Sequence, residues 1–503
     1  MKQILLISLI ILCSISLFGK RPNVIVVMTD DQGYGELSVH GNPVIKTPNL
    51  DRLHGESLRL VDYHVAPMCT ATRGQLMSGM DAVRNGATNV SSGRTLLRSD
   101  LSTMADYFKN NGYRTGIFGK WHLGDNYPYR PQDRGFEETL WFPSSHINAA
   151  SDYWNNDYFD NTFIVNGKQR KIDGYCTDVF FDQAMSWMKS KADADEPFFT
   201  YIPTNAPHWP FWAPSTDVAR AKKALEGKDF PEFDSNDLER FEGYVAMILN
   251  VDDNMGRLID FLKRESLEDD TILIFTTDNG STFGHMYFNA GMRGHKTELY
   301  EGGHRVPFFI RWPNGNLGEP RDIDGLTQSQ DVLPSLIDLC DLNTYEATRF
   351  DGLSLGPVFL EGSKSVSDNR KLVINYSRMP FNFEYRSPES PSVITRNGAA
   401  VLWKHWRLIQ GKELYNLKKD PAQKKDVFDR YPEIVAEMSS HLDSWWEELE
   451  AVANKPQEVT IGTSHENPTK LCASEWFDVF VDTQGQIWKG VLKNGYWHLN
   501  VAR

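Results

Sequence analysis

The stretch Asn23-Val24-Ile25-Val26-Val27-Met28 runs directly into Thr29-Asp30-Asp31. Its apolar residues are continuous rather than alternating and are rich in β-branched side chains, which is typical of a strand buried on both faces of a parallel sheet. A second run of this kind, residues 271–276, ends at Thr277-Asp278-Asn279. Because ligands bind beyond the carboxyl ends of parallel strands, the two acidic clusters mark a candidate site at one edge of a predicted sheet.

Further strands and helices alternate along the chain around these two runs. We predict strands at residues 114–118, 197–202, 306–311 and 371–375, and helices at residues 104–110 and 238–264. Strands that alternate with helices indicate a doubly wound arrangement. The sequence therefore predicts the α/β class, with a large doubly wound mixed sheet flanked by helices.

The sequence pattern changes near residue 380. Short alternating runs, a tryptophan-rich patch and an amphipathic segment at residues 431–449 predict a smaller C-terminal α+β subdomain with a terminal helix. The expected division is a signal peptide at 1–19, a large domain with the candidate site at 20–380, the subdomain at 381–450 and a β-rich extension at 451–503. In the extension we expect short strands at residues 477–481, 487–492 and 497–501.

The composition narrows the range of partners and locations. The 53 basic and 67 acidic residues among 503 leave a net charge of −14, which disfavours nonspecific binding to nucleic acid or to an anionic membrane. Residues 1–19 resemble a secretory signal, because Lys2 precedes an apolar run at 4–18 that is too short to span a bilayer. No later apolar run is long enough to span one. We expect an exported protein, periplasmic or secreted, without stable membrane insertion.

Two patches in the first third of the chain carry side chains suited to an anion. In Cys69-Thr70-Ala71-Thr72-Arg73, the guanidinium four residues after the cysteine can hold an oxyanion. Lys120 and His122 follow the strand predicted at 114–118 and place a cation and a proton carrier at its end. Taken alone, these residues have simpler interpretations, a buried thiol and a surface Lys-x-His.

Two further patches lie later in the chain. His208 follows the strand predicted at 197–202 and stands between Pro207 and Pro210, which restrict its backbone. A glycine-rich loop at 293–307 contributes Lys296 and leads into an apolar strand. The simpler interpretations here are a packing loop and a solvated basic face.

In their order along the chain, these patches resemble the motifs of the type I sulfatases, which belong to the alkaline phosphatase superfamily. The resemblance covers residues 22–312 and, more loosely, 401–446. In that family the motif cysteine is oxidised after translation to formylglycine, an aldehyde whose hydrate is the nucleophile. This sequence departs from the usual motif at Ala71, where proline is common, and at Thr72 and Ser78, where serine and threonine are common. Ala71 leaves open which maturation system acts on Cys69.

The resemblance implies a sulfuric ester hydrolase with a divalent cation. It implies that Ca²⁺, or Mg²⁺, is bound by Asp30, Asp31, Cys69, Asp278 and Asn279. It assigns catalytic roles to Cys69 as formylglycine, Arg73, Lys120, His122, His208 and Lys296. In this scheme the lysines neutralise sulfate oxygens, His208 protonates the leaving oxygen, and His122 takes the proton whose removal releases sulfate.

The expected substrate is a sulfate ester of a polysaccharide or oligosaccharide, as for bacterial carbohydrate sulfatases. The candidates for sugar binding are Trp209, His285, His295, His304 and Arg305. A formylglycine-generating enzyme is the other expected partner. Two alternatives stay open, a phosphodiester or phosphonate ester hydrolase of the same superfamily and a non-catalytic protein that binds sulfated glycans.

Overall fold

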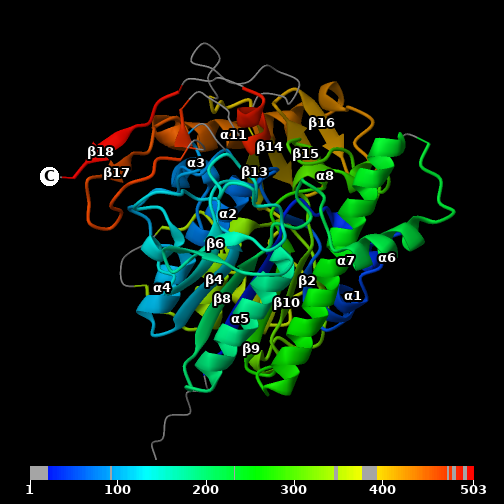
Figure 1. Ribbon diagram of the computed structural model, residues 1–503. Coiled ribbons are helices and arrows are strands. Elements are labelled where there is room, and N and C mark those ends of the chain that lie inside the picture. Colours follow the sequence, from blue (N-terminus) through cyan, green and yellow to red (C-terminus); the bar gives the residue numbers. More distant parts are fainter. Residues whose placement is uncertain are drawn as a thin grey trace, which may run out of the picture.

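The computed structural model describes residues 21–90, 93–231, 233–344, 349–376, 393–472, 475–477, 483–490 and 495–502. Its main feature is a ten-stranded mixed sheet with the order β11-β2-β10-β9-β1-β8-β4-β5-β6-β7 (Figure 1). Its strands are β1 (Asn23–Thr29), β2 (Leu58–Leu60), β4 (Arg114–Lys120), β5 (Glu138–Phe142), β6 (Thr162–Val165), β7 (Lys168–Lys171), β8 (Phe198–Pro203), β9 (Thr271–Thr277), β10 (Phe308–Arg311) and β11 (Asp322–Ile323). The predicted α/β class with a large mixed sheet is confirmed. The signal peptide predicted at 1–19 lies outside the described residues.

Five successive strands of this sheet, β9, β1, β8, β4 and β5, are parallel and bring their carboxyl ends to one edge. β1 pairs in parallel with β8 on one side and with β9 on the other, and β4 pairs in parallel with β8. The strand predicted at 114–118 extends to Lys120, so this lysine belongs to the strand end itself. The strand predicted at 306–311 begins only at Phe308, after Pro307, which lacks the N–H that a ladder requires.

Helices cover both faces of the main sheet, as continuous apolar strands require. On one face, Val24, Val26 and Met28 of β1 share a core with α2 (Cys69–Ser78), α4 (Met104–Asn110) and α9 (Val332–Leu339). On the other, Ile25 and Val27 share a core with α1 (Pro48–Gly55), α5 (Cys176–Ala192) and α7 (Ser235–Arg264). Figure 1 shows α5 and α7 lying along this second face.

A smaller antiparallel sheet lies at one end of the main sheet, beside α2 and α8 (Glu301–His304) (Figure 1). It has four strands, β13 (Lys371–Asn375), β14 (Ala399–Trp403), β15 (Trp406–Ile409) and β16 (Glu413–Asn416). α11 (Pro432–Ala453) packs on it through Met438 and Leu442. The strand predicted at 371–375 is present, but it pairs with β14 and so belongs to this second sheet. The domain boundary predicted at 380 lies outside the described residues.

The C-terminal residues combine a short sheet with a helix. β17 (Val459–Ile461) pairs in parallel with β18 (Leu499–Val501), so the strand predicted at 497–501 is shorter than expected. The strand predicted at 487–492 is wrong at its start, because Gln484–Trp488 is the helix α12, begun by a capping box between Thr483 and Gln486. Most of the strand predicted at 477–481 lies outside the described residues. Among the helices that are described, none is both long and apolar enough to cross a membrane.

Candidate active site

The acidic side chains at the ends of β1 and β9 meet around Cys69. One ligand atom each from Asp30, Asp31, Cys69 and Asp278 lies within 4.8 Å of the others, and all four residues are buried. Asp31 has a φ of 70°, a left-handed backbone that turns the chain immediately after β1. Asn279 lies beside them, because its Nδ2 donates a hydrogen bond to Asp31 Oδ1 at 2.8 Å. The parallel pairing of β1 and β9 thus builds one acidic pocket from two distant segments.

Cys69 is the first residue of α2, a helix whose ten residues are all buried. The amino end of a helix carries a partial positive charge, which favours a negative group there. Nevertheless, burial raises the pKa of the Cys69 thiol to about 12, so the thiol is protonated and weakly nucleophilic at neutral pH. Arg73, one turn later, donates from Nε and from Nη2 to Asp278 Oδ2 at 3.1 and 2.7 Å.

Two lysines bind the carboxylates that follow β1. Lys120 Nζ lies 2.6 Å from Asp30 Oδ2, and Lys296 Nζ lies 2.6 Å from Asp31 Oδ1. With Arg73, they place three basic side chains against the three carboxyl groups of the pocket. We call the following residues the strand-end cluster: Asp30, Asp31, Cys69, Arg73, Lys120, Asp278, Asn279 and Lys296.

Lys296 reaches this cluster because the loop before α8 and α8 itself pack closely on the end of β9. The backbone N–H of Gly280 donates to Gly303 O at 3.0 Å, and a Cβ at residue 280 would lie 1.8 Å from Gly302 O. Lys296 N donates to Ser281 O at 3.0 Å in the same contact. The stretch Asp278-Asn279-Gly280 therefore supplies both polar side chains and the only residue type that allows the loop to dock.

The donor set of the strand-end cluster fits a hard divalent cation. Asp30 Oδ1 and Asn279 Oδ1 are buried and accept no hydrogen bond. Burial and the neighbouring Asp278 carboxylate raise the pKa of Asp30 to about 8, even though Lys120 opposes the shift. A cation would satisfy the two free oxygens and offset the repulsion between the carboxylates, because Ca²⁺ and Mg²⁺ bind carboxylate and amide oxygens.

His208 and His122 follow the ends of β8 and β4 and approach the cluster from another side. His208 Nε2 lies 3.7 Å from Asp31 Oδ2, and its side chain is 14% exposed. His122 is buried, with Nε2 3.2 Å from Val90 O and no hydrogen-bond partner at Nδ1. Burial, followed by the nearby positive charges, lowers the pKa of both imidazoles well below the usual value. Both rings are therefore neutral at rest.

Three of the candidate sugar-binding residues adjoin residues of the site. Trp209 follows His208, is 44% exposed and meets the ring of His146 edge-on. His295 precedes Lys296, and its ring stacks on that of His285 with 4.2 Å between centroids. All three are at least partly accessible to a ligand.

The other two candidates are engaged with the protein itself. His304 is wrong as a substrate contact, because it is fully buried and its Nδ1 lies 2.9 Å from His64 Nδ1. Arg305 donates from Nε and Nη2 to Val61 O at 3.1 and 2.7 Å, and its guanidinium lies over the ring of Tyr34.

Two residues beside the site were not among the predicted ones. Glu36 is buried and accepts hydrogen bonds from Gly33 N at 2.6 Å and from Tyr244 OH at 2.5 Å, which fixes the loop after β1. The spacing of a glycine and a glutamate three residues later is the only local signal for this contact. His146 stacks on His208 with 5.4 Å between ring centroids, and it comes from a loop after β5 without a recognisable motif.

Known proteins match the chain over most of its length. The sulfatase family matches residues 22–342, and the family described as N-sulphoglucosamine sulphohydrolase, C-terminal, matches residues 292–448. An uncharacterized sulfatase, YdeN of Escherichia coli, is 26% identical over 493 residues, covering 83% of this chain and 84% of that protein. The ulvan-active sulfatase of Formosa agariphila is 26% identical over 400 residues, covering 75% of each.

A solved structure shows the same fold. The crystal structure of Ps i-CgsB in complex with k-i-k-neocarrahexaose is similar with a TM-score of 0.73 at 24% identity, covering 93% of this chain and 97% of that one. The sulfatase match spans well over half of the chain and contains the whole strand-end cluster. The chain therefore belongs to the sulfatase family, the type I sulfatases of the alkaline phosphatase superfamily.

Proposed function

We propose that this sulfatase hydrolyses sulfate monoesters of a polysaccharide or oligosaccharide, with residue 69 as formylglycine and one bound Ca²⁺. The observation that carries the proposal is the strand-end cluster. Cys69 lies within 4.8 Å of three buried carboxylates, and these carboxylates also hold two lysines and an arginine. A nucleophile position, cation-binding oxygens and positive side chains in one buried pocket suit attack on an anionic ester.

The encoded thiol of Cys69 is poorly suited to this attack. Its raised pKa, about 12, keeps the thiol protonated, and a protonated thiol is not the reactive form. Formylglycine supplies a hydrated aldehyde with two hydroxyl groups, which neither cysteine nor serine offers. The amino end of α2 and the guanidinium of Arg73 favour negative charge at this position.

Asp30, Asp31, Asp278 and Asn279 would hold the cation. All four offer oxygen atoms, and the free Oδ1 atoms of Asp30 and Asn279 are the least satisfied of these. An all-oxygen set of carboxylates and an amide favours Ca²⁺. The bound ion supplies positive charge that lowers the cost of negative charge at residue 69 and at the ester.

The lysines and the partly exposed His208 serve the substrate in this proposal. Each lysine has three N–H donors, so Lys120 and Lys296 can bind their carboxylates and still donate to sulfate oxygens. His208 is the accessible imidazole and is assigned to protonate the leaving oxygen. Its neutral resting state changes when an anionic ester binds, because a neighbouring negative charge raises the pKa of a base. Buried His122 is assigned to accept the proton whose removal releases sulfate.

The carbohydrate part of the proposal is supported by the exposed surface next to His208 and Lys296. Trp209 presents an accessible aromatic ring, on which sugars commonly pack, and His285 and His295 form a stacked pair beside Lys296. One relative is named for activity on ulvan, and a protein of the same fold was solved with neocarrahexaose. We further propose export through residues 1–19 and maturation of Cys69 by a formylglycine-generating enzyme.

The decisive experiment is the mass of the tryptic peptide of residues 60–73 from protein expressed together with a maturation enzyme. We expect a mass lower by the difference between a thiol and an aldehyde side chain, and reaction with a hydrazide. The turnover rate should increase in proportion to the fraction of protein in which residue 69 is formylglycine. A fully active protein with unmodified Cys69 would contradict the proposed nucleophile.

Matched substrates test the chemistry separately. We expect cleavage of an aryl sulfate to exceed cleavage of the corresponding aryl phosphate diester or phosphonate ester by a large factor. The variant Cys69→Ala serves as the control, because it removes the nucleophile and leaves the carboxylates in place. A higher rate on the phosphorus esters would favour the alternative hydrolase, and no turnover by fully modified protein would favour a glycan-binding function.

A further inference from the structure

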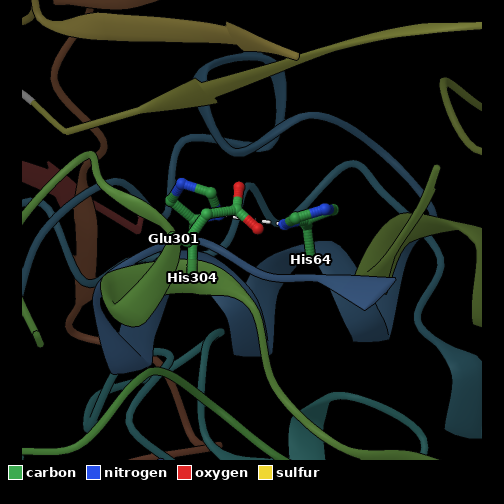
Figure 2. Close-up of side chains that lie close together, drawn as sticks. All are labelled: His64, Glu301 and His304. Atoms are coloured by element: carbon green, nitrogen blue, oxygen red, sulfur yellow. Dashed lines mark hydrogen bonds between the residues drawn. The ribbon is translucent and has the colours of Figure 1, made fainter. Parts of the chain in front are cut away.

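A second buried group of metal-binding side chains lies between the main sheet and the smaller sheet. It consists of His64, from β3 (Tyr63–His64), and Glu301 and His304, from α8, and all three are at most 1% exposed. One ligand atom from each lies within 4.8 Å of the others. Figure 2 shows the three side chains pointing toward one another, with the carboxylate of Glu301 next to the two imidazole rings.

The hydrogen bonds of the two imidazoles turn their Nδ1 atoms toward each other. His64 Nε2 lies 2.9 Å from Asp62 Oδ1, and His304 Nε2 lies 3.2 Å from Leu299 O. Both of these partners only accept, so each Nε2 carries the N–H. A neutral imidazole has a single N–H, so a neutral ring held in this way presents a lone pair at Nδ1. The two Nδ1 atoms are 2.9 Å apart, a distance that fits one shared proton or, after a small separation, a metal ion between them.

Glu301 completes a set of ligands. Its Oε1 accepts from Arg407 Nε at 2.5 Å, whereas its Oε2 is buried and has no hydrogen-bond partner. Two imidazole nitrogens and one carboxylate oxygen form a ligand set that proteins use for Zn²⁺. Imidazoles that bind a metal usually donate their other N–H to a carboxylate or a backbone carbonyl, as His64 and His304 do here.

We propose that His64, Glu301 and His304 form a second cation site, distinct from the strand-end cluster, and that this site binds Zn²⁺. Zn–N bonds of about 2.0–2.1 Å at a tetrahedral angle place two nitrogens roughly 3.3 Å apart, so the rings need to separate by only a few tenths of an ångström. Nitrogen ligands distinguish this site from the all-oxygen cluster and favour Zn²⁺ over Ca²⁺. The positive charge of Arg407, which binds Glu301, repels a cation and lowers the affinity of the site for Zn²⁺.

The place of this site gives it a structural role. Val65 N, next to His64, donates to His304 O at 2.8 Å, and Thr297 N, next to Lys296, donates to Pro67 O at 2.8 Å. A cation there would therefore fasten the segment that leads to Cys69 onto the segment that carries Lys296. We call Asp62, His64, Glu301, His304 and Arg407 the junction cluster, because Arg407 of β15 joins the smaller sheet to it.

Zinc content measures the proposed site directly. The mature protein is dialysed against a low concentration of Zn²⁺ with Ca²⁺ in excess, so that Ca²⁺ fills the strand-end cluster, and bound zinc is measured by mass spectrometry. We expect one zinc per chain in the wild type and a loss of nearly all of it in His64→Gln and in His304→Gln. His441→Gln, a histidine on α11 outside the cluster, should keep the wild-type zinc content.

Anomalous diffraction at the zinc edge decides the question without any variant. A peak between the Nδ1 atoms of His64 and His304 would support the proposal. Absence of that peak in crystals equilibrated with zinc would overturn it and would assign a shared proton to the pair instead. Zinc retained equally by His304→Gln and by His441→Gln would overturn it as well.

Discussion

The strand-end cluster and the junction cluster both bury carboxylates against an arginine, yet their chemistry differs. In the strand-end cluster the atoms available to bind a cation are carboxylate and amide oxygens, and Asp30 and Asn279 each leave one oxygen without a hydrogen-bond partner. In the junction cluster the imidazoles are anchored through Nε2, and Arg407 binds both Glu301 and Asp62. The strand-end cluster also adjoins a partly exposed imidazole, that of His208. The contrast teaches that buried charge and an unsatisfied oxygen, which Glu301 Oε2 of the junction cluster also provides, do not by themselves mark a site of turnover, whereas a nucleophile position among the carboxylates does.

The largest effect separating the two clusters is expected for Asp30→Asn. This change removes a cation ligand and weakens the hold on Lys120, so we expect kcat to fall by roughly 10³-fold or more. The stability of the calcium-free protein should change in the opposite direction, because Asp30→Asn should raise its free energy of unfolding at high pH. The folded protein holds the Asp30 proton up to about pH 8, whereas the unfolded chain releases it near 3.8, so stability of the calcium-free protein falls as pH rises between these values.

Two measurements check this prediction. Steady-state kinetics on an aryl sulfate should show the loss of kcat, and urea unfolding without calcium should show a smaller decrease in stability with pH for Asp30→Asn than for the wild type. A variant that keeps turnover would contradict the metal assignment. A variant that is strongly destabilised at pH 8 without calcium would contradict the repulsion that we describe among the carboxylates.

A smaller effect, which depends on the substrate, is expected for His208→Ala. A general acid typically contributes about 10²–10⁴-fold, and the loss should be large for sugar sulfates and small for aryl sulfates with good leaving groups. Burial and the two lysines lower the pKa of His208, so the protonated form becomes more abundant as pH falls. We expect kcat/KM on a sugar sulfate to rise as pH decreases toward mildly acidic values. Equal losses on both substrates would contradict the role of proton donor.

The junction cluster should affect stability rather than turnover. Arg407→Met leaves Glu301 and Asp62 without their cation, and breaking such a buried pair costs about 3–5 kcal/mol. Chemical unfolding without added zinc measures the loss, and turnover per folded molecule should stay within a few-fold of the wild type. The control is Lys371→Met, which removes an ion pair to Glu437, a side chain that is 51% exposed. This change should lower the free energy of unfolding by only about 0–1 kcal/mol. Equal losses of unfolding free energy in Arg407→Met and Lys371→Met would contradict the difference that we expect between a buried and an exposed ion pair.

The central part of the site could be predicted because it depends on local patterns. A continuous apolar run followed by carboxylates predicts both a buried strand and polar groups at its end, and β1 and β9 show this arrangement. The parallel order of the sheet then brings Asp30, Asp31 and Asp278 together. The helix predicted at 104–110 has the bounds of α4, since Thr103 and Asp106 form a capping box at its start.

The remaining features depend on contacts between distant segments, which no local pattern records. His304 lies in a basic, glycine-rich loop that reads as accessible, yet α8 buries it against His64. Glu36 owes its role to Tyr244, whose hydroxyl lies 2.5 Å from its carboxylate and belongs to a helix far along the chain. The strand at 371–375 has the right bounds, but its hydrophobic pattern does not say which of two sheets it joins.

The complete burial of α2 has a consequence for timing. Cys69 is 1% exposed, and every residue of its helix is covered in the folded protein. An enzyme that oxidises this side chain has to reach it, and the docked helix prevents this. The proposed modification of Cys69 therefore has to occur while the chain is being made or exported, before α2 docks against the main sheet. A molecule that folds first with its cysteine intact would stay inactive for as long as it remains folded.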